Sequence, residues 1–447
     1  MSFHKVLVAN RGEIALRVIE ACRELSLDSV VVFSQADAAM TYLRLAGEAL
    51  CIGPPNPARS YLSIPTLLTA AQLTGAEAIH PGYGFLAEDP EFVELCEEYG
   101  LHFIGPARET MELLGNKVAA RDAVSAAGVP ILPGEPVPED KDDLVAAGER
   151  IGYPLFVKAV FGGGGRGMRL IPSPEALMPA VQAAQAEAKL AFGNGAAYLE
   201  RAVSNPRHIE VQVLADHHGH VVHFGERECS VQRRHQKLVE ESPAPNLDEN
   251  IRSALHNAAI RTAKAVGYRN AGTVEFVLDN GNRFYFIEMN ARIQVEHPVS
   301  EVIAGVNLIK EQIRIAQGEP LGWTQGDIVL RGHAIECRIN AEDTARNFLP
   351  SCGRVTIDEL PTGNGIRLDT HLYNGMEVLP YYDSLLAKVI AWGADREEVR
   401  IRMYTALERF RVRGVATTRS LAQEIISHPA FRGEQLGTAF LDQILTD

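Results

Sequence analysis

The strongest constraint on the fold is a run of glycines between two apolar stretches. The run reads KAVFGGGGRGMR over 158–169, with YPLFV before it and LIP after it. The glycines fit G-x-G-x-x-G, but a dinucleotide-binding turn needs a helix at the third glycine, and a strand stopped by Pro172 follows here. The chain contains no Gly-Lys dipeptide, which excludes a P-loop. A flexible linker is the alternative, but the flanking strands favour a glycine-tipped hairpin that covers phosphates, with Lys158 pointing toward them.

A second hairpin is predicted over 272–298, which reads GTVEFVLDNGNRFYFIEMNARIQVEHP. The Asn-Gly dipeptide at 280–281 is typical of a tight turn. A two-residue turn would place Glu275 opposite Phe286 and make Glu275 and Glu288 diagonal neighbours, whereas a bulged turn would shift this register. Two adjacent carboxylates are unfavourable without a cation, and their oxygens on a rigid sheet suit Mg²⁺ or Mn²⁺.

The period-two alternation brings four more side chains to the face of the two glutamates: Asn290, Arg292, Gln294 and Glu296. Phe284 and Phe286 would share this face, which favours burial over the alternative of a solvated sheet surface. A guanidinium near a carboxylate that could act as a base is the arrangement expected for a small oxyanion substrate.

Residues 1–110 alternate apolar stretches with helical periodicity. Strands are expected at VLVAN, SVVVFS, AEAIHPGYG and LHFIGP, and the first is followed by an apolar helical face of Ile14, Val18, Cys22 and Leu25. This alternation predicts a small parallel α/β domain with its ligand site at the carboxyl ends of the strands. The proline- and acid-rich stretch at 129–143 is expected to be a linker or a domain entry.

The composition is typical of a soluble multidomain enzyme. A chain of 447 residues is too long for one core, and 46% hydrophobic with 22% charged residues describes a globular protein. The net charge of −14 argues against nucleic-acid binding. The six cysteines include no C-x-x-C pair, which favours reduced thiols in the cytoplasm. No leader pattern or apolar run of membrane-spanning length occurs, so no membrane association is expected.

Long motifs follow one another along the whole chain: ANRGEIALRVI, IHPGYGFLAE, GNKVAARDA, GGGGRGMR, NPRHIEVQVLAD, ECSVQRRHQKLVEESPAP, FIEMNARIQVEHPVSE, GHAIECRINAED and YYDSLLAKVIAWG. In sequence and order they resemble the biotin carboxylases, the ATP-grasp subunits of biotin-dependent carboxylases such as acetyl-CoA carboxylase. The resemblance implies an α/β and α+β architecture with an ATP-grasp fold. It divides the chain into an N-terminal Rossmann-like (preATP-grasp) domain at 1–113, an ATP-grasp domain at 114–330 with a mobile lid at about 131–203, and a biotin carboxylase C-terminal domain at 331–447.

The resemblance also implies a role for each matching position. The positions that match the ATP site are Lys117 and Lys158 at the phosphates, Gly164 and Gly165 in the lid, Glu200 and Val203 at the adenine, and His208, Gln232, His235 and Lys237 around the ribose and phosphates. The positions that match the ligands of two Mg²⁺ or Mn²⁺ ions are Glu275, Glu288 and Asn290. The positions that match the bicarbonate and biotin sites are Arg292, Gln294 and Val295, Glu296 as general base with Lys237 nearby, and Arg338 for the enolate form of biotin.

The implied reaction has two steps. Glu296 deprotonates bicarbonate, and the carbonate attacks the γ-phosphate of ATP to give carboxyphosphate. This breaks down to CO₂ and phosphate, which takes the N1′ proton of biotin while Arg338 stabilises the anion that captures CO₂. The chain has no Met-Lys dipeptide to carry biotin and no length for a carboxyltransferase. Biotin is therefore expected on a separate carrier protein, with a separate carboxyltransferase as partner and a homodimer as the assembly.

Some positions depart from the usual family pattern, among them Val160-Phe161, Ala291, Asn307, Cys352 and Thr418. None of them removes a catalytic group. Two alternative functions are weighed against the resemblance. Another ATP-grasp ligase would not be expected to share RRHQK or RIQVEHPV, and a non-catalytic nucleotide-binding regulator should have lost Lys237, Glu296 or Arg338.

Overall fold

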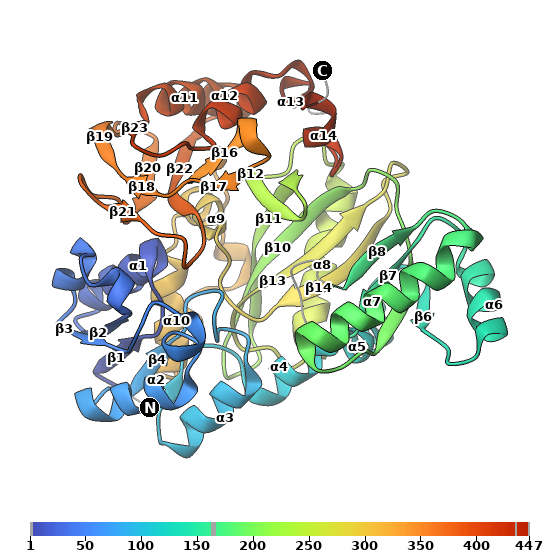
Figure 1. Ribbon diagram of the computed structural model, residues 1–447, viewed down its shortest axis with the longest axis horizontal. Coiled ribbons are helices and arrows are strands. Elements are labelled where there is room, and N and C mark those ends of the chain that lie inside the picture. The colour runs from blue at the N-terminus through green and yellow to red at the C-terminus, as the bar shows by residue number, and fades with distance from the viewer. Residues whose placement is uncertain (1–2, 162–166, 434–435, 446–447) are drawn as a thin grey trace.

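The N-terminal part of the chain forms a five-stranded parallel sheet in the order β3-β2-β1-β4-β5 (Figure 1). The computed structural model describes residues 3–161, 167–433 and 436–445. The strands are β1 (Lys5–Val8), β2 (Asp28–Phe33), β3 (Glu48–Cys51), β4 (Ala78–His80) and β5 (His102–Phe103). The predicted parallel α/β domain is confirmed, but β3 was missing from the expected strands. It is a short edge strand whose residues are exposed or half-buried, so it lacks an apolar pattern.

Helices connect the strands of this sheet and lead into the next part of the chain. Their bounds are α1 (Gly12–Glu24), α2 (Ile64–Thr74), α3 (Pro90–Glu98), α4 (Arg108–Gly115) and α5 (Lys117–Ala126). The face of α1 that was predicted to be apolar is buried at Ile14, Val18 and Cys22, and Leu25 packs beside it.

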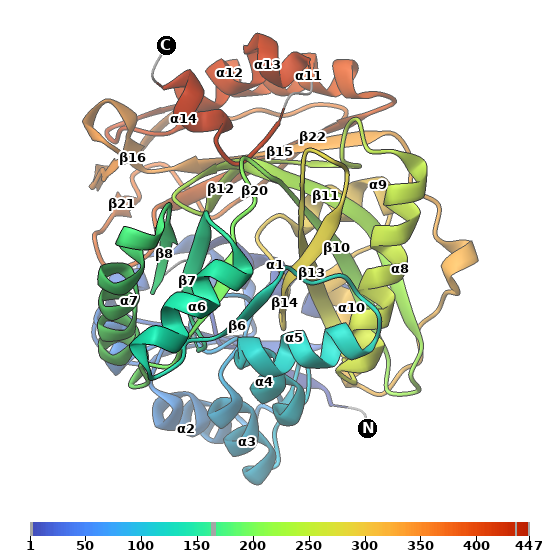
Figure 2. The ribbon, with the colours of Figure 1, turned by 90° about the vertical axis from the view of Figure 1, so that its right-hand side faces the viewer.

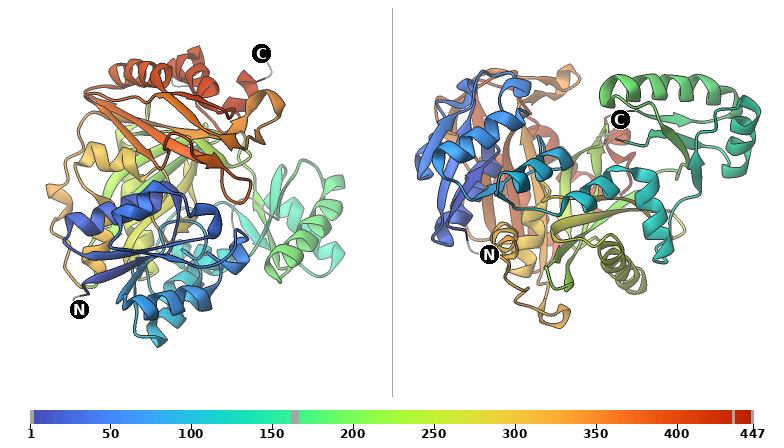
Figure 3. Two further views of the ribbon diagram at one scale, coloured as in Figure 1. Left: turned by 60° about the vertical axis from the view of Figure 1, so that its left-hand side comes forward. Right: turned by 90° about the horizontal axis from the view of Figure 1, so that it is seen from below.

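Residues 134–201 form a separate four-stranded sheet that projects from the side of the molecule (Figure 3). Its elements are β6 (Gly134–Pro136), α6 (Lys141–Ile151), β7 (Leu155–Ala159), β8 (Met168–Ile171), α7 (Leu177–Phe192) and β9 (Ala197–Arg201). The predicted hairpin around the glycine run is confirmed, since β7 and β8 are antiparallel with Lys158 opposite Met168. Gly164 and Gly165 lie outside the described residues. Of the two alternatives expected for 129–143, the domain entry fits the structure better than the linker, because β6 adds an edge strand to the sheet, where a proline such as Pro136 is tolerated.

An eight-stranded sheet in the order β14-β13-β10-β11-β12-β15-β22-β20 forms the centre of the molecule. Its strands are β10 (Arg207–Ala215), β11 (Val221–Arg233), β12 (Gln236–Ser242), β13 (Asn270–Leu278), β14 (Phe284–Asn290), β15 (His333–Asn340), β20 (Ile366–Thr370) and β22 (Leu385–Gly393). The strands β10–β14 and the strands β15, β20 and β22 are joined by the antiparallel pairing of β12 with β15, in which Val239 lies opposite Cys337. One sheet therefore continues across the expected boundary between 114–330 and 331–447.

Helices cover this sheet, and Figure 2 shows the last four stacked above β15 and β22. The helices after β9 are α8 (Glu249–Ala265), α9 (His297–Ala304), α10 (Leu308–Ala316), α11 (Arg396–Arg409), α12 (Arg419–Ser427), α13 (Pro429–Arg432) and α14 (Phe440–Ile444). Short strands complete the C-terminal part: β16 (Glu342–Asp343), β17 (Leu349–Pro350), β18 (Gly353–Arg354), β19 (Thr356–Glu359), β21 (Glu377–Val378) and β23 (Arg411–Arg413). Within the described ranges, no helix is both long enough and apolar enough to span a membrane.

The predicted register of the β13–β14 hairpin is wrong. The turn is longer than two residues, with Asp279 N donating to Arg283 O at 2.9 Å, so Leu278 pairs with Phe284 instead of Arg283. A register shift next to Glu275 then places it directly opposite Glu288. The two carboxylates are therefore closer neighbours than the diagonal pair that the sequence predicted.

The same bulge separates the phenylalanines from the glutamates. Phe284 and Phe286 pack with Phe276 in an apolar cluster on the other face of the hairpin. The prediction that they share the glutamate face is therefore wrong. Glu275 nevertheless keeps its predicted neighbour Asn290, because the bulge precedes Glu288 and the alternation of Glu288 and Asn290 is undisturbed.

Candidate active site

Glu275, Glu288 and Asn290 form one side of the candidate site, on β13 and β14. Asn290 Nδ2 donates to Glu275 Oε1 at 2.9 Å. Burial and the facing Glu275 raise the pKa of Glu288. Burial would also raise the pKa of Glu275, but Lys237 and His208 hold it well below its usual range. Negative charge at Glu288 is therefore the less well compensated of the two, and a cation there would lower the energy.

Lys237 on β12 joins this acidic pair to the rest of the site. Its Nζ donates to Glu210 Oε2 at 2.5 Å, to Glu296 Oε1 at 2.6 Å and to Glu275 Oε1 at 3.1 Å. Burial alone would lower the pKa of Lys237, but these three carboxylates raise it well above its usual value. The ammonium is therefore charged and lies at the centre of three carboxylates.

Glu296 lies between two cations. It occupies the N-cap position of α9, and its Oε2 accepts from Arg338 Nη2 at 2.8 Å while Lys237 holds Oε1. Arg338 Nε in turn donates to Glu240 Oε1 at 2.6 Å. Burial would raise the pKa of Glu296, but Lys237 and Arg338 hold it well below its usual range. The carboxylate is therefore charged, which is the form that can accept a proton.

Arg292 is held beside the acidic pair by Glu88, which follows the glycine turn HPGYGF of the N-terminal domain. Its Nε donates to Glu88 Oε2 at 2.8 Å, and its Nη2 donates to Asn290 Oδ1 at 3.0 Å. The predicted strand alternation through 292–296 is wrong, because β14 ends at Asn290. The side chains of Arg292, Gln294 and Glu296 nevertheless contact the same site.

The nucleotide side contains several of the expected residues. His208 on β10 has Nε2 at 3.0 Å from Glu275 Oε2. Lys158 forms an ion pair with the buried Glu200, which Arg121 also contacts. Lys117 is the first residue of α5, and burial lowers its pKa.

Four further expected residues lie at the edges of this region. Gln232 on β11 is opposite Lys237 on β12, and His235 occupies the turn between these strands with a positive φ of 68°. Burial lowers the pKa of His235, which favours its neutral form. Val203 is half-buried just after β9. Val295 contributes its carbonyl oxygen to Lys388 Nζ at 3.0 Å.

The structure adds residues that sequence reasoning did not assign to the site. They are Glu88, Glu210, Arg227, Glu240 and Lys388. A signal was available for Glu210 and Lys388, because they are charged residues within the apolar strands HIEVQV and AKVIAWG. A charge there is costly unless it is paired, so a partner should have been sought.

The donor set of the site fits a divalent cation. Carboxylate and amide oxygens are what Mg²⁺ and Mn²⁺ prefer, and Glu275, Glu288 and Asn290 offer them from two paired strands. A second possible ligand group joins His208, Glu210 and Glu275, whose ligand atoms lie within 4.8 Å of one another. Lys237 Nζ already lies against Glu210 and Glu275 there, which makes the Glu288 side the better place for an added cation.

Known families account for nearly the whole chain. Residues 2–111 match the biotin carboxylase N-terminal domain, residues 116–324 the carbamoyl-phosphate synthase L chain ATP-binding domain, and residues 336–443 the biotin carboxylase C-terminal domain. The biotin carboxylase of Pseudomonas aeruginosa is 51% identical over 429 residues, which cover 96% of this chain and 95% of that protein. The chain belongs to the biotin carboxylase family. It is an ATP-dependent ligase with biotin carboxylase activity.

Solved structures of biotin carboxylases agree with this assignment. The biotin carboxylase of Campylobacter jejuni, crystallised as a β,γ-ATP complex, has a TM-score of 0.96 and 44% identity, with 99% of each chain covered. The biotin carboxylase domain dimer of Hydrogenobacter thermophilus 2-oxoglutarate carboxylase, in complex with MgADP, ADP and bicarbonate, has a TM-score of 0.96 and 46% identity, with 99% of this chain and 98% of that chain covered. The ATP-grasp fold and the biotin carboxylase N- and C-terminal domains are thereby established.

Proposed function

We propose that this biotin carboxylase uses ATP and bicarbonate to carboxylate biotin on a separate carrier protein, through carboxyphosphate. The observation that carries the proposal is the chain of contacts from the acidic pair through Lys237 and Glu296 to Arg338. These contacts bring together the residues that we assign as metal ligands, as proton acceptor and as the arginine for an anionic substrate. The reaction needs these three groups close together.

The first step is proton removal from bicarbonate. Arg292 holds bicarbonate with its guanidinium, and Gln294 and Val295 complete the pocket. The charged Glu296 accepts the proton, and the carbonate attacks the γ-phosphate of ATP. Lys237 lies at 2.6 Å from Glu296 and compensates the charge that develops during phosphoryl transfer. A metal ion held by Glu275, Glu288 and Asn290 would supply further charge neutralisation at the phosphates.

The second step is carboxylation of biotin. Carboxyphosphate gives CO₂ and phosphate, and the phosphate takes the N1′ proton of biotin. Arg338 then stabilises the enolate-like anion with its guanidinium, which Glu240 and Glu296 hold in place. The anion captures CO₂ to give carboxybiotin.

The remaining positions are assigned to ATP. We assign Lys117 and Lys158 to the phosphates, with Gly164 and Gly165 of the lid over them, Glu200 and Val203 to the adenine, and His208, Gln232 and His235 to the ribose and phosphates. Lys158 is ion-paired with Glu200 in this structure, so it exchanges or shares this partner when phosphates bind. Closure of the lid at 131–203 keeps water from carboxyphosphate.

The proposed assembly is a cytoplasmic homodimer that works with a biotin carboxyl carrier protein and a separate carboxyltransferase. We also propose the domain boundaries that the resemblance implies, with domains at 1–113, 114–330 and 331–447. Support for a dimer comes from the Hydrogenobacter thermophilus relative, which was solved as a domain dimer. The carboxyltransferase determines the final acceptor of the carboxyl group, since the domains matched in this chain are those of biotin carboxylation.

The test is ADP release from ATP and bicarbonate, with and without free biotin. Biotin should raise the rate in the wild-type protein. Arg338→Ala should lose this rise but keep slow bicarbonate-dependent ADP release, because Glu296 and Lys237 remain in contact. A folded wild-type protein whose rate does not respond to biotin would refute the proposal.

A further inference from the structure

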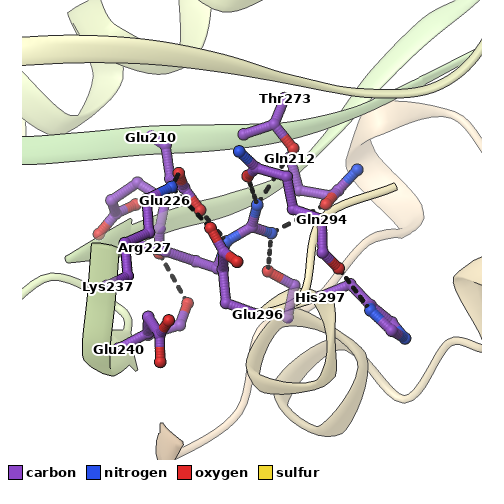
Figure 4. A network of polar contacts seen from close by, with 12 residues as sticks. Glu210, Gln212, Glu226, Arg227, Lys237, Glu240, Thr273, Gln294, Glu296 and His297 are labelled. Atoms are coloured by element: carbon purple, nitrogen blue, oxygen red, sulfur yellow. Dashed lines mark hydrogen bonds and ion pairs between the residues drawn. The ribbon is translucent and has the colours of Figure 1, made fainter. Parts of the chain in front are cut away.

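Arg227 on β11 lies beneath the candidate site with no exposed side-chain surface (Figure 4). Its acceptors are Glu210 Oε1 at 2.5 Å, Gln212 Oε1 at 2.8 Å, Ser300 Oγ at 3.0 Å, Thr273 Oγ1 at 3.1 Å and Gln294 Oε1 at 2.9 Å. A guanidinium has five N–H groups in a fixed plane, so every donor of Arg227 has a partner. The proposed roles above give Arg227 no part in the reaction.

Two of these partners reach the site directly and close a ring of contacts. Glu210 Oε2 accepts from Lys237 Nζ at 2.5 Å, and Lys237 Nζ also donates to Glu275 Oε1 at 3.1 Å. Gln294 Nε2 donates to the same Glu275 oxygen at 2.7 Å. Gln294 Oε1 accepts from Arg227, which closes the ring. Displacement of Arg227 therefore releases two neighbours of Glu275 at once.

The ring also determines which way the amide of Gln294 points. A guanidinium can only donate hydrogen bonds, so the Gln294 oxygen must face Arg227. Its NH₂ group must then face Glu275 and the pocket, where it can donate to an oxygen of a bound anion. Without Arg227 the two ends of the amide could exchange places, and the pocket would lose a donor.

Arg227 also contacts the helix that follows the base. Ser300 lies in the first turn of α9, which begins directly after Glu296, and its hydroxyl accepts from Arg227. His297 Nδ1 lies at 2.7 Å from Gln294 O in the same segment. Figure 4 marks this contact with a dashed line. The guanidinium thus ties β11 to both ends of the 294–300 turn.

We propose that Arg227 is a positioning residue for bicarbonate, which orients the Gln294 amide and, through Glu210, the Lys237 ammonium. This inference rests on the proposed function, because bicarbonate is the anion assigned to Gln294. Arg227 touches no reacting atom. Its removal should therefore weaken bicarbonate use specifically, with little effect on ATP.

The test is steady-state kinetics of Arg227→Lys, which keeps the buried charge but has three donors on a flexible stem. The KM for bicarbonate should rise about tenfold or more, as expected for losing a charge-assisted hydrogen bond, while the KM for MgATP stays within about twofold. Ser300→Ala is the matched control, because it removes one acceptor of the same guanidinium outside the ring. Its KM for bicarbonate should stay within about twofold of the wild type. An unchanged KM for bicarbonate in Arg227→Lys, or an equal rise in both KM values, would overturn the proposal.

Gln294→Glu provides a second test if Arg227→Lys does not fold by circular dichroism. The new carboxylate can still accept from Arg227. Its second oxygen replaces the Gln294 NH₂ group, so the side that faces Glu275 and the pocket has an acceptor in place of a donor. The KM for bicarbonate should again rise about tenfold or more, and an unchanged value would contradict the proposed amide orientation. All variants are compared by bicarbonate-dependent ADP release without biotin. If biotin does not raise the rate of ADP release by the wild-type protein, the proposed function is refuted. The role of Arg227 is decided separately, by the KM for bicarbonate.

Discussion

Lys388 on β22 is the buried cation whose removal gives the clearest stability prediction. Its side chain is fully buried, with Nζ at 3.0 Å from Glu13 Oε2 and 3.7 Å from Asp369 Oδ2. It also donates to Val295 O at 3.0 Å, in the proposed bicarbonate pocket. Asp369 keeps Arg367 as a partner when Lys388 is lost, whereas Glu13 keeps only a neutral contact with the hydroxyl of Tyr83 among the described residues.

The substitution Lys388→Met therefore leaves the Glu13 carboxylate buried without a cation. Removing one partner of a buried ion pair costs about 3–5 kcal/mol. At about 2–4 °C per kcal/mol for a folding unit of 150–250 residues, the first thermal transition should fall by about 10 °C. Differential scanning calorimetry measures this, and Glu13→Gln/Lys388→Met is the matched variant. The double variant should regain at least half of the loss, because it removes the uncompensated charge as well.

The pH dependence of the loss tests its cause. Burial already raises the pKa of Glu13, and removal of Lys388 raises it further. A carboxyl group with a raised pKa in the folded state stabilises the fold at low pH, and this contribution is lost as pH rises. Lys388→Met should therefore be more destabilised at pH 8.5 than at pH 5.5. An equal loss at both pH values, or a double variant no more stable than Lys388→Met, would refute the ion-pair explanation.

Two further predictions concern protonation and metal binding. His80 is fully buried, its Nδ1 accepts from Gly82 N at 3.0 Å, and burial lowers its pKa to about 3. The stability that the neutral ring contributes is complete above pH 6.5 and falls as pH drops. Wild type should be more stable than His80→Gln, and chemical denaturation should show this difference in unfolding free energy shrinking by about 2 kcal/mol between pH 7.5 and pH 5. A difference that stays constant with pH would contradict this explanation. Glu288→Gln should raise the Mg²⁺ concentration needed for half-maximal activity about tenfold, since it removes a charged ligand. Its melting temperature without Mg²⁺ should not fall, because repulsion from Glu275 is relieved; a lower melting temperature with unchanged Mg²⁺ dependence would argue against the metal assignment.

Local patterns predicted much of the fold. The N-terminal strand–helix alternation, the hairpin around the glycine run and the turn at 280–281 follow from short-range signals, and all three occur in the structure. The register at Glu275 was missed because a bulge depends on both strands and on the turn between them. The eight-stranded sheet was missed because the pairing of β12 with β15 joins segments about 90 residues apart, which no local pattern reveals.

The site was predictable only in part for the same reason. Glu275, Glu288, Asn290 and the charged residues up to Glu296 lie in one stretch, so their alternation could be followed along the sequence. Arg227 and Glu88 reach this stretch from strands and loops elsewhere in the chain. Their contacts depend on tertiary structure, which no local pattern of the sequence reveals.

The most direct test of the proposed function is transfer of labelled carbon from bicarbonate to biotin. The protein is incubated with ¹⁴C-bicarbonate, Mg²⁺, ATP and free biotin, and the biotin is separated at alkaline pH. We predict acid-labile label on biotin that requires ATP and is lost in Arg338→Ala. ADP formation without any label on biotin would contradict the account of how this site works.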